Sequence, residues 1–442
     1  MNGVAPVDLR LVNELISTRL GLHFPEERWP DLLRGLRAAA VEFGFPDEQS
    51  CLQWLTAAPL THREIEILAG NLTVGETYFL REKESFDILT ERILPELVLA
   101  RRGVERRLRL WSAGCCTGEE AYSLAIMLQR VIPDLADWNV TILATDLNPR
   151  FLRKAAAGMF REWSFRETPA WLKEEYFREA GENTCEILPK VRHRVTFEHL
   201  NLVEDVYPSL ATDTNAMDII FCRNVLMYFT PEQAQRVIER LHRSLVEGGW
   251  LIVGLTEAAL PLSPPFAHVN FDGGTFYRKV NHHPPTIEEE PAGEVAAQAV
   301  APLPKRPPTL VAVMLQRARE LADQGLLSES LEWCDKSVVA GKLNPVAHYL
   351  RAVVLQEQGA TAEATRSFER ALSIAPDFVL AQFALGTLLD QHGKKPEARK
   401  HYRKALHLLR ACRQEELVPE SGGMTAGRLA EIIQTMLEAG ER

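Results

Sequence analysis

The sequence predicts an α/β fold, with a doubly wound, mostly parallel sheet between a small helical region and an all-helical repeat region. Three observations support this prediction. Between about residues 80 and 280, short apolar runs alternate with helical stretches. Beyond residue 309, glycine and small residues recur every 34 positions. Between these parts lies a proline-rich stretch, so we expect separate domains at 442 residues, too many for one ordinary core.

Residues 1–75 form the predicted N-terminal helical domain. Apolar residues at helical spacing begin with Leu9, Val12 and Ile16. Thr61, followed by a charged turn, predicts a helix N-cap. Five arginines either belong to an ordinary solvated surface or form a basic docking face: Arg19, Arg28, Arg34, Arg37 and Arg63.

Residues 76–280 form the predicted sheet domain. The expected helices include Glu119–Val131 and Pro231–Leu245, and a small β-subdomain is expected at about 180–198. Buried strands that alternate with helices indicate a parallel sheet, and ligands bind such sheets at the carboxyl ends of the strands. The predicted strands are 109–114, 140–146, 217–224 and 249–254.

Residues 281–308 form a predicted linker. Seven of these 28 residues are proline and none is aromatic. Such a segment cannot bury enough apolar surface to fold, so we expect a semi-extended connection.

Residues 309–442 repeat with a period of 34, which resembles tetratricopeptide repeats. Gly325, Gly359 and Gly393 suit the turns between paired helices. Small residues follow at the predicted helix contacts, and Pro345 lies three residues later than Pro376 implies, which predicts a short insertion in the first repeat. We expect a last helix, at about 425–437, to cap the array.

Composition excludes several classes of protein. The formal net charge of −10 disfavours general nucleic-acid binding. Residues 1–10 lack the apolar core of a signal peptide, and no run of 18 apolar residues suggests a membrane span. Seven scattered cysteines show no metal-binding spacing, so we expect a cytoplasmic protein with reduced thiols and no metal. Redox chemistry at Cys115 and Cys116 is the less favoured alternative.

The strongest local motif is a strand, a turn containing Gly114 and Gly118, and a helix that opens with Glu119 and Glu120. The glycine spacing fits neither a dinucleotide fingerprint nor a phosphate loop. The two acids suit a cationic ligand such as S-adenosylmethionine, or they merely complement the helix dipole. Asp146, at the end of the next strand, can bind ribose hydroxyls, which supports a nucleoside ligand without specifying which one.

Six segments of the chain carry a family pattern: Thr77–Glu82, Ser112–Glu120, Ala144–Asn148, Leu200–Leu202, Phe221–Phe229 and Gly248–Glu257. Together they resemble chemotaxis-receptor glutamate methyltransferases over residues 1–280. This family methyl-esterifies glutamate side chains of chemoreceptors. The resemblance implies a Rossmann-like methyltransferase fold, S-adenosylmethionine as cofactor and S-adenosylhomocysteine as product. With the repeats, the whole chain resembles tetratricopeptide-bearing methyltransferases of chemosensory-type signalling.

The resemblance also implies roles for individual residues. Tyr228 and Arg81 would be catalytic, with Tyr228 at the transferred methyl group. Gly75 stands where the family often has asparagine, which removes one expected cofactor contact. The residues implied in cofactor binding are Thr77, Arg81, Gly114, Glu119, Glu120, Asp146, Asn201, Leu202, Asn224 and Val225.

The implied partners are the cytoplasmic domain of a chemoreceptor, as substrate, and a protein bound by the repeats. Nucleic acid and direct membrane insertion are not expected. Some relatives bind a receptor-end peptide at the edge of a glycine-rich β-subdomain. Here that stretch has one glycine, Gly181, and a proline, Pro189, so we expect no dependence on such a peptide.

Two other functions remain open from the residues alone. A nicotinamide-dependent oxidoreductase would need three clustered glycines at the first turn, and the sequence lacks them. A non-catalytic scaffold would not need Arg81, Asp146, Asn224 and Tyr228, which are all present.

Overall fold

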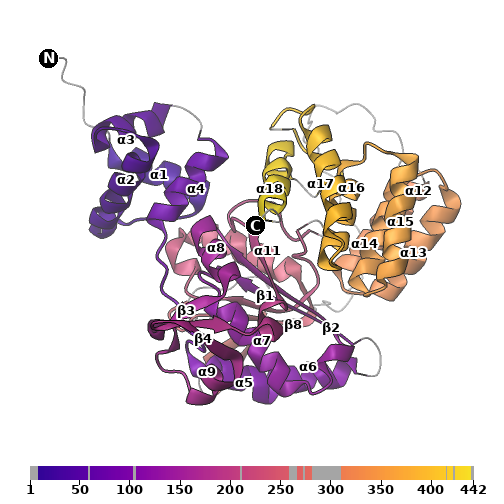
Figure 1. The fold of residues 1–442 in the computed structure, drawn as a ribbon, viewed down its shortest axis with the longest axis horizontal. Coiled ribbons are helices and arrows are strands. Elements are labelled where there is room, and N and C mark those ends of the chain that lie inside the picture. Colours follow the sequence, from indigo (N-terminus) through magenta and orange to yellow (C-terminus); the bar gives the residue numbers. More distant parts are fainter. Residues whose placement is uncertain are drawn as a thin grey trace, which may run out of the picture. The chain divides into compact units, whose positions relative to one another are not determined.

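The structure is a computed structural model that describes residues 8–57, 60–102, 106–209, 212–257, 266–271, 274–280, 310–414, 416–421 and 424–439. The chain divides into two compact units, Met1–Lys279 and Val280–Arg442 (Figure 1). The predicted linker, 281–308, lies outside the described residues.

The N-terminal helices pack around an apolar core. Val12, Ile16 and Leu36 are fully or almost fully buried in this core. Thr61 and Glu64 form a reciprocal capping box, which confirms the predicted N-cap. The helices are α1 (Leu9–Leu20), α2 (Trp29–Phe43), α3 (Glu48–Ala57) and α4 (His62–Leu72).

The central sheet has seven strands in the order β6-β2-β1-β7-β8-β10-β9. The first five are parallel, and β10 and β9 are antiparallel, which confirms the predicted doubly wound α/β fold. Their bounds are β1 (Arg107–Ala113), β2 (Asn139–Asp146), β6 (Val195–His199), β7 (Met217–Cys222), β8 (Leu245–Val253), β9 (Phe266–Phe271) and β10 (Gly274–Lys279).

Two apolar cores lie on the two faces of this sheet. Leu110 belongs to one core and its neighbour Trp111 to the other, because side chains alternate along a strand. Helices that surround the sheet in the same unit are α5 (Lys83–Ile88), α6 (Leu94–Arg101), α7 (Glu119–Val131), α8 (Pro149–Ala157), α9 (Ala170–Tyr176) and α11 (Pro231–Ser244).

The small β-subdomain lies earlier in the chain than expected. Its strands are β3 (Met159–Arg161), β4 (Phe177–Gly181) and β5 (Thr184–Ile187), in the order β3-β5-β4. The predicted range of 180–198 was wrong because 195–199 pairs with β2 in the central sheet. Pro189 begins the short helix α10 (Pro189–Arg192), where a missing N–H costs nothing, and is not part of an edge strand.

Among its described residues, the second unit contains three helix pairs and a last helix. Gly325, Gly359 and Gly393 all have φ between 74° and 77°, at the turn within each pair. Ser330, Ala364 and Ala398 are at most 1% exposed at the helix contacts. This confirms the tetratricopeptide-type prediction and a C-terminal helix, α18 (Ala426–Ala439), that contacts α17.

The predicted insertion at Pro345 is wrong. Each pair is joined to the next by four residues, 341–344 and 375–378. Pro345 occupies the first position of α14 and so starts a helix, whereas Pro376 lies in the preceding loop. The paired helices are α12 (Leu310–Asp323), α13 (Leu327–Ala340), α14 (Pro345–Glu357), α15 (Thr361–Ile374), α16 (Val379–Gln391) and α17 (Lys395–Leu409).

Candidate active site

A cavity of about 460 Å³ lies at the carboxyl ends of β1, β2 and β7. These strands are parallel neighbours, so the residues that follow them meet at one edge of the sheet. Every predicted site residue except Glu119 lines this cavity: Thr77, Arg81, Gly114, Glu120, Asp146, Asn201, Leu202, Asn224, Val225 and Tyr228.

The turn after β1 passes close to the opposite wall. Gly114 has φ of 86°, and a Cβ atom there would lie 2.4 Å from Cγ2 of Val225. No other residue fits this position without moving the wall. The glycine therefore sets how close the turn and the Val225 segment can come.

Asp146 ends β2 with its carboxylate fixed by the backbone. The side chain accepts hydrogen bonds of 2.8 Å from the N–H groups of Cys116 and Asn148. Burial nevertheless raises the pKa of Asp146 to about 6. These bonds orient the carboxylate at the cavity, where it can accept further hydrogen bonds from a ligand's hydroxyl groups.

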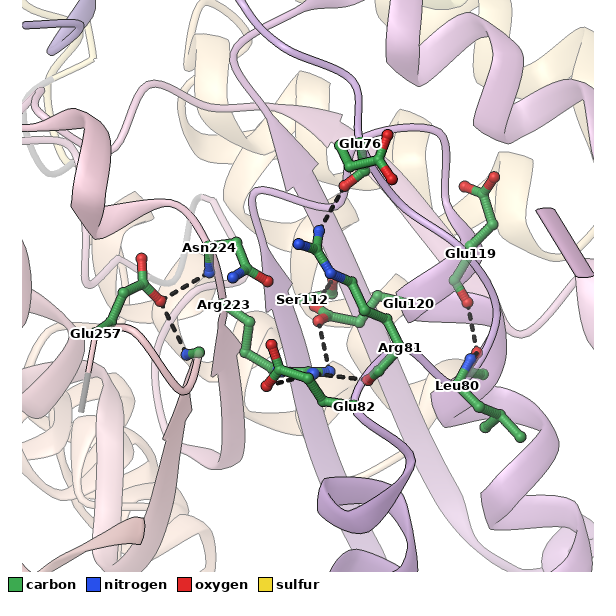
Figure 2. Close-up of polar contacts among 12 residues, drawn as sticks. Glu76, Leu80, Arg81, Glu82, Ser112, Glu119, Glu120, Arg223, Asn224 and Glu257 are labelled. Atoms are coloured by element: carbon green, nitrogen blue, oxygen red, sulfur yellow. Dashed lines mark hydrogen bonds and ion pairs between the residues drawn. The ribbon is translucent and has the colours of Figure 1, made fainter. Parts of the chain in front are cut away.

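The two glutamates that open α7 differ in direction. Glu120 lines the cavity, accepts a 2.7 Å hydrogen bond from Ser112 and faces Arg223. Glu119 instead accepts hydrogen bonds from Thr117 (2.7 Å) and Ser164 (2.9 Å), and Figure 2 shows its side chain apart from this cluster. Glu119 therefore does not line the cavity, because consecutive helical residues point about 100° apart, and its contact with the cofactor stays a prediction.

Arg223 is a buried cation that the sequence prediction missed. Its guanidinium donates a 2.6 Å hydrogen bond to the carbonyl of Arg81 and lies 2.9 Å from Glu82 and 3.5 Å from Glu120 (Figure 2). Its side chain is only 1% exposed. Arg223 therefore joins the α7 carboxylate to the backbone that carries Arg81.

Arg81 lies between two residues with unusual backbone angles. Leu80 and Glu82 have φ of 54° and 53°, a region that non-glycine residues rarely adopt. Ser123 accepts the N–H of Leu80 at 3.0 Å. The Arg81 guanidinium donates a 2.6 Å bond to the Glu76 carbonyl (Figure 2), so both its backbone and its side chain are held at the cavity.

Glu257 fixes the loop that carries Asn224, Val225 and Tyr228. Its carboxylate is 1% exposed and accepts four backbone N–H groups: Asn224 (2.7 Å), Val225 (2.7 Å), Gly254 (2.9 Å) and Met227 (3.2 Å). Asn224 itself has φ of 59°. The sequence had placed Glu257 in a family-like segment without a role, and only the fold reveals its partners.

Tyr228 is half-buried between the sheet domain and the N-terminal helices. It packs against the N-terminal core, and its carbonyl accepts a 2.8 Å bond from His23. Burial raises its pKa, while the nearby cations Arg28 and Arg81 lower it less. The hydroxyl thus stays protonated near neutral pH and can donate a hydrogen bond.

The N-terminal helical region contributes directly to the cavity, which the sequence prediction did not anticipate. Leu20, His23 and Arg28 are among its lining residues. Three of the arginines proposed for a basic face pair with acids: Arg28 and Arg34 both bind Asp31, and Arg37 binds Glu48. Arg28 is the member of that group that lines the cavity.

Asn201 and Gly75 connect the cavity to its surroundings. The Asn201 amide donates a 2.8 Å bond to the Arg19 carbonyl, so it ties α1 to the cavity wall, next to Leu202. A Cβ atom on Gly75 would lie 2.7 Å from the ring of Phe151. The asparagine expected from the family pattern would therefore require the Phe151 ring, which also lines the cavity, to move.

Cys115 and Cys116 line the cavity as neutral thiols. Burial raises the pKa of Cys116 to about 12 and that of Cys115 well above its ordinary value. A buried neutral thiol is a poor nucleophile, which disfavours the redox alternative. All seven cysteines are free, as predicted.

The cavity fits S-adenosylmethionine. Its volume is in the range of small-molecule sites, and Asp146 and Glu120 offer carboxylates to hydroxyl and ammonium groups. Apolar side chains such as Leu147, Phe151 and Leu202 can contact an adenine ring. A doubly wound sheet with this site defines the class of S-adenosylmethionine-dependent methyltransferases.

Comparison with known proteins identifies the family. Residues 75–272 match the family model described as CheR methyltransferase, SAM binding domain. Chemotaxis protein methyltransferase 1 of Pseudomonas aeruginosa is 35% identical over 218 residues, which cover 48% of this chain and 77% of that protein. The chain belongs to this family of chemotaxis methyltransferases, and its cofactor is S-adenosylmethionine.

Two further relatives extend the comparison. The probable biofilm formation methyltransferase WspC of Pseudomonas aeruginosa is 28% identical over 410 residues, or 89% of each chain. An uncharacterized 104.1 kDa protein of Rhodobacter capsulatus is 34% identical over 268 residues, which are 60% of this chain but only 27% of that longer protein.

Among the described residues, no helix is both long and apolar enough to cross a bilayer.

Proposed function

We propose that this enzyme methyl-esterifies glutamate side chains on the cytoplasmic domain of a chemoreceptor, for adaptation in a chemosensory-type signalling system. The observation that carries the proposal is one cavity lined by the carboxylate Asp146, the cation Arg81 and the phenol Tyr228. Relatives are named as chemotaxis protein methyltransferases, which supports a receptor as the acceptor.

The cations near Tyr228 favour an anionic acceptor at that part of the cavity. Arg28 and Arg81 both lie close enough to Tyr228 to influence its hydroxyl. A glutamate carboxylate is already ionised at neutral pH, since its ordinary pKa is about 4.3, so no general base is needed. A guanidinium can hold such a carboxylate through two parallel hydrogen bonds.

The residues of the chain then have to orient and desolvate the reactants. When bound, S-adenosylmethionine supplies a methyl group activated by a positively charged sulfur. Arg81 orients the acceptor carboxylate, and Tyr228 donates its hydroxyl hydrogen bond at the reacting centre. Alignment of this kind can account for a large part of the rate enhancement.

The proposed cofactor contacts follow from the cavity lining. Asp146 binds the ribose hydroxyls, and Glu120 binds the ammonium group. Asn201 acts here as a wall residue, because its amide is bonded to Arg19. Thr77, Gly114, Leu202, Asn224 and Val225 complete the set.

The proposal is tested by methyl transfer from labelled S-adenosylmethionine to a purified chemoreceptor cytoplasmic domain. We expect base-labile label on the receptor, as a methyl ester requires, and no label when its accepting glutamates are replaced by glutamine. Stable label on other side chains, or no transfer despite cofactor binding, would reject the proposed acceptor.

We further propose that the enzyme works in the cytoplasm and that its repeats bind a protein partner. Paired helices of this kind form extended surfaces that bind proteins.

We also propose that the enzyme does not depend on binding a peptide from the receptor's C-terminal end. Pro189 no longer supports this view, because it lies in α10 and β4 is an edge strand that keeps its own backbone groups. The remaining support is the short hairpin formed by β4 and β5. Calorimetry with receptor C-terminal peptides tests it, and micromolar binding would contradict it.

A further inference from the structure

Two exposed apolar side chains line the same cavity as the proposed catalytic residues. Val74 is 55% exposed and Met227 is 54% exposed. Met227 directly follows the buried Leu226, and Val74 begins a short exposed stretch, 74–76. Isolated apolar residues on a surface need no explanation, but two that border one catalytic cavity do.

Hydrogen bonds hold the segments that carry both side chains. Thr73, next to Val74, accepts a 2.8 Å bond from Asn148 and donates a 2.7 Å bond to the Ala69 carbonyl. The N–H of Met227 is bonded to Glu257 at 3.2 Å. A rigid apolar rim loses little conformational entropy when a partner covers it.

We propose that Val74 and Met227 contact apolar side chains that flank the acceptor carboxylate on the substrate protein. The inference rests on the proposed function and specifies its acceptor: a glutamate with aliphatic neighbours. The cationic pair Arg28 and Arg81 selects the carboxylate, while the apolar rim selects its surroundings. Methionine suits this role because its flexible thioether adapts to side chains of different shape.

The test uses the full chain and variants that keep the side-chain size. Val74→Thr and Met227→Gln remove apolar character, and Leu99→Gln is the matched control, because Leu99 is 80% exposed on α6 and does not line the cavity. Two glutamate peptides serve as probes, one with leucines and one with serines beside the glutamate. A chemoreceptor cytoplasmic domain is the protein acceptor.

We expect the wild type to prefer the leucine peptide about tenfold in kcat/KM, as one well-packed apolar contact allows. The double variant should lose this preference and raise the KM for the receptor domain, with kcat and the Kd for S-adenosylmethionine unchanged. Leu99→Gln should behave as the wild type.

Three outcomes would overturn the inference. The wild type could show no preference between the peptides, the double variant could retain the preference, or the variants could weaken cofactor binding as much as acceptor binding. If the wild type methylates no glutamate at all, the proposed function fails first and this inference fails with it.

Discussion

Glu257→Gln keeps the size of a buried side chain and removes its charge. In the native loop, one carboxylate oxygen accepts Val225 and Met227, and the other accepts Asn224 and Gly254. Glutamine has only one acceptor oxygen, so its NH₂ group would face two backbone donors. Each buried donor left unsatisfied costs about 1–3 kcal/mol.

Two unsatisfied donors would cost about 2–6 kcal/mol in an unmoved loop, and relaxation of the loop toward water reduces this cost to the lower end, about 2–3 kcal/mol. A displaced loop moves Tyr228 and Asn224 together, so the free energy appears in the transition state. We expect kcat to fall roughly 30- to 150-fold. Gly254→Ala should act in the same direction, because its Cβ would lie 2.9 Å from both Glu257 and the Asn224 amide.

The assay is kcat at saturating cofactor and receptor domain, measured well below the unfolding temperature and per folded molecule. Glu239→Gln is the control, since this glutamate on α11 is exposed and its carboxylate accepts a 3.1 Å hydrogen bond from the Gln235 side chain. A kcat within threefold of the wild type, with a normal fold, would refute the positioning role of Glu257. Loss of folding alone, with full kcat in the folded fraction, would make the residue structural.

Three further predictions concern the cavity and the two units. Tyr228→Phe and Arg81→Ala should lower labelled methyl transfer more than cofactor affinity, and near wild-type rates in both would reject the site. Because burial raises the pKa of Asp146 to about 6, its charge is lost as the pH falls through that value. Calorimetry should show cofactor affinity falling by up to about tenfold per pH unit below it, and Asp146→Asn should remove this inflection. In the free enzyme the raised pKa has the opposite effect on stability, because the folded state holds the Asp146 proton more tightly than the unfolded state. The free energy of unfolding should therefore decrease as the pH rises from about 4 to about 6. A chain ending at Val280 should fold cooperatively and methylate receptor fragments; a molten or inactive product would contradict independent units.

Local patterns in the sequence predicted the parts of the fold that depend on neighbouring residues. Helix α7 begins and ends where its periodicity and glycine turn placed it, at Glu119 and Val131. Strand β2 ends at Asp146 as predicted. The repeat period identified the paired helices because glycine turns and small contact residues recur in each pair.

The sequence could not predict features set by distant contacts. β3 has only three residues and pairs with β5, so no periodicity reveals it. The difference between Glu119 and Glu120 depends on Ser164 and Arg223, which are 45 and 103 residues away from them. Arg28 reaches the cavity only because the N-terminal helices pack beside Tyr228.

Arg223, Glu82 and Glu120 form a buried charged cluster at the cavity, and its cost suggests a role in function rather than in stability. Buried ion pairs rarely stabilise a fold more than apolar residues of similar size, because the charges must leave water. Leu80 and Glu82 add backbone strain of about 1–3 kcal/mol each. Arg223 binds both Glu82 and the Arg81 carbonyl, so it holds the strained segment in place. These costs are offset elsewhere in the fold, and their consequence is a guanidinium fixed at the cavity before any acceptor arrives.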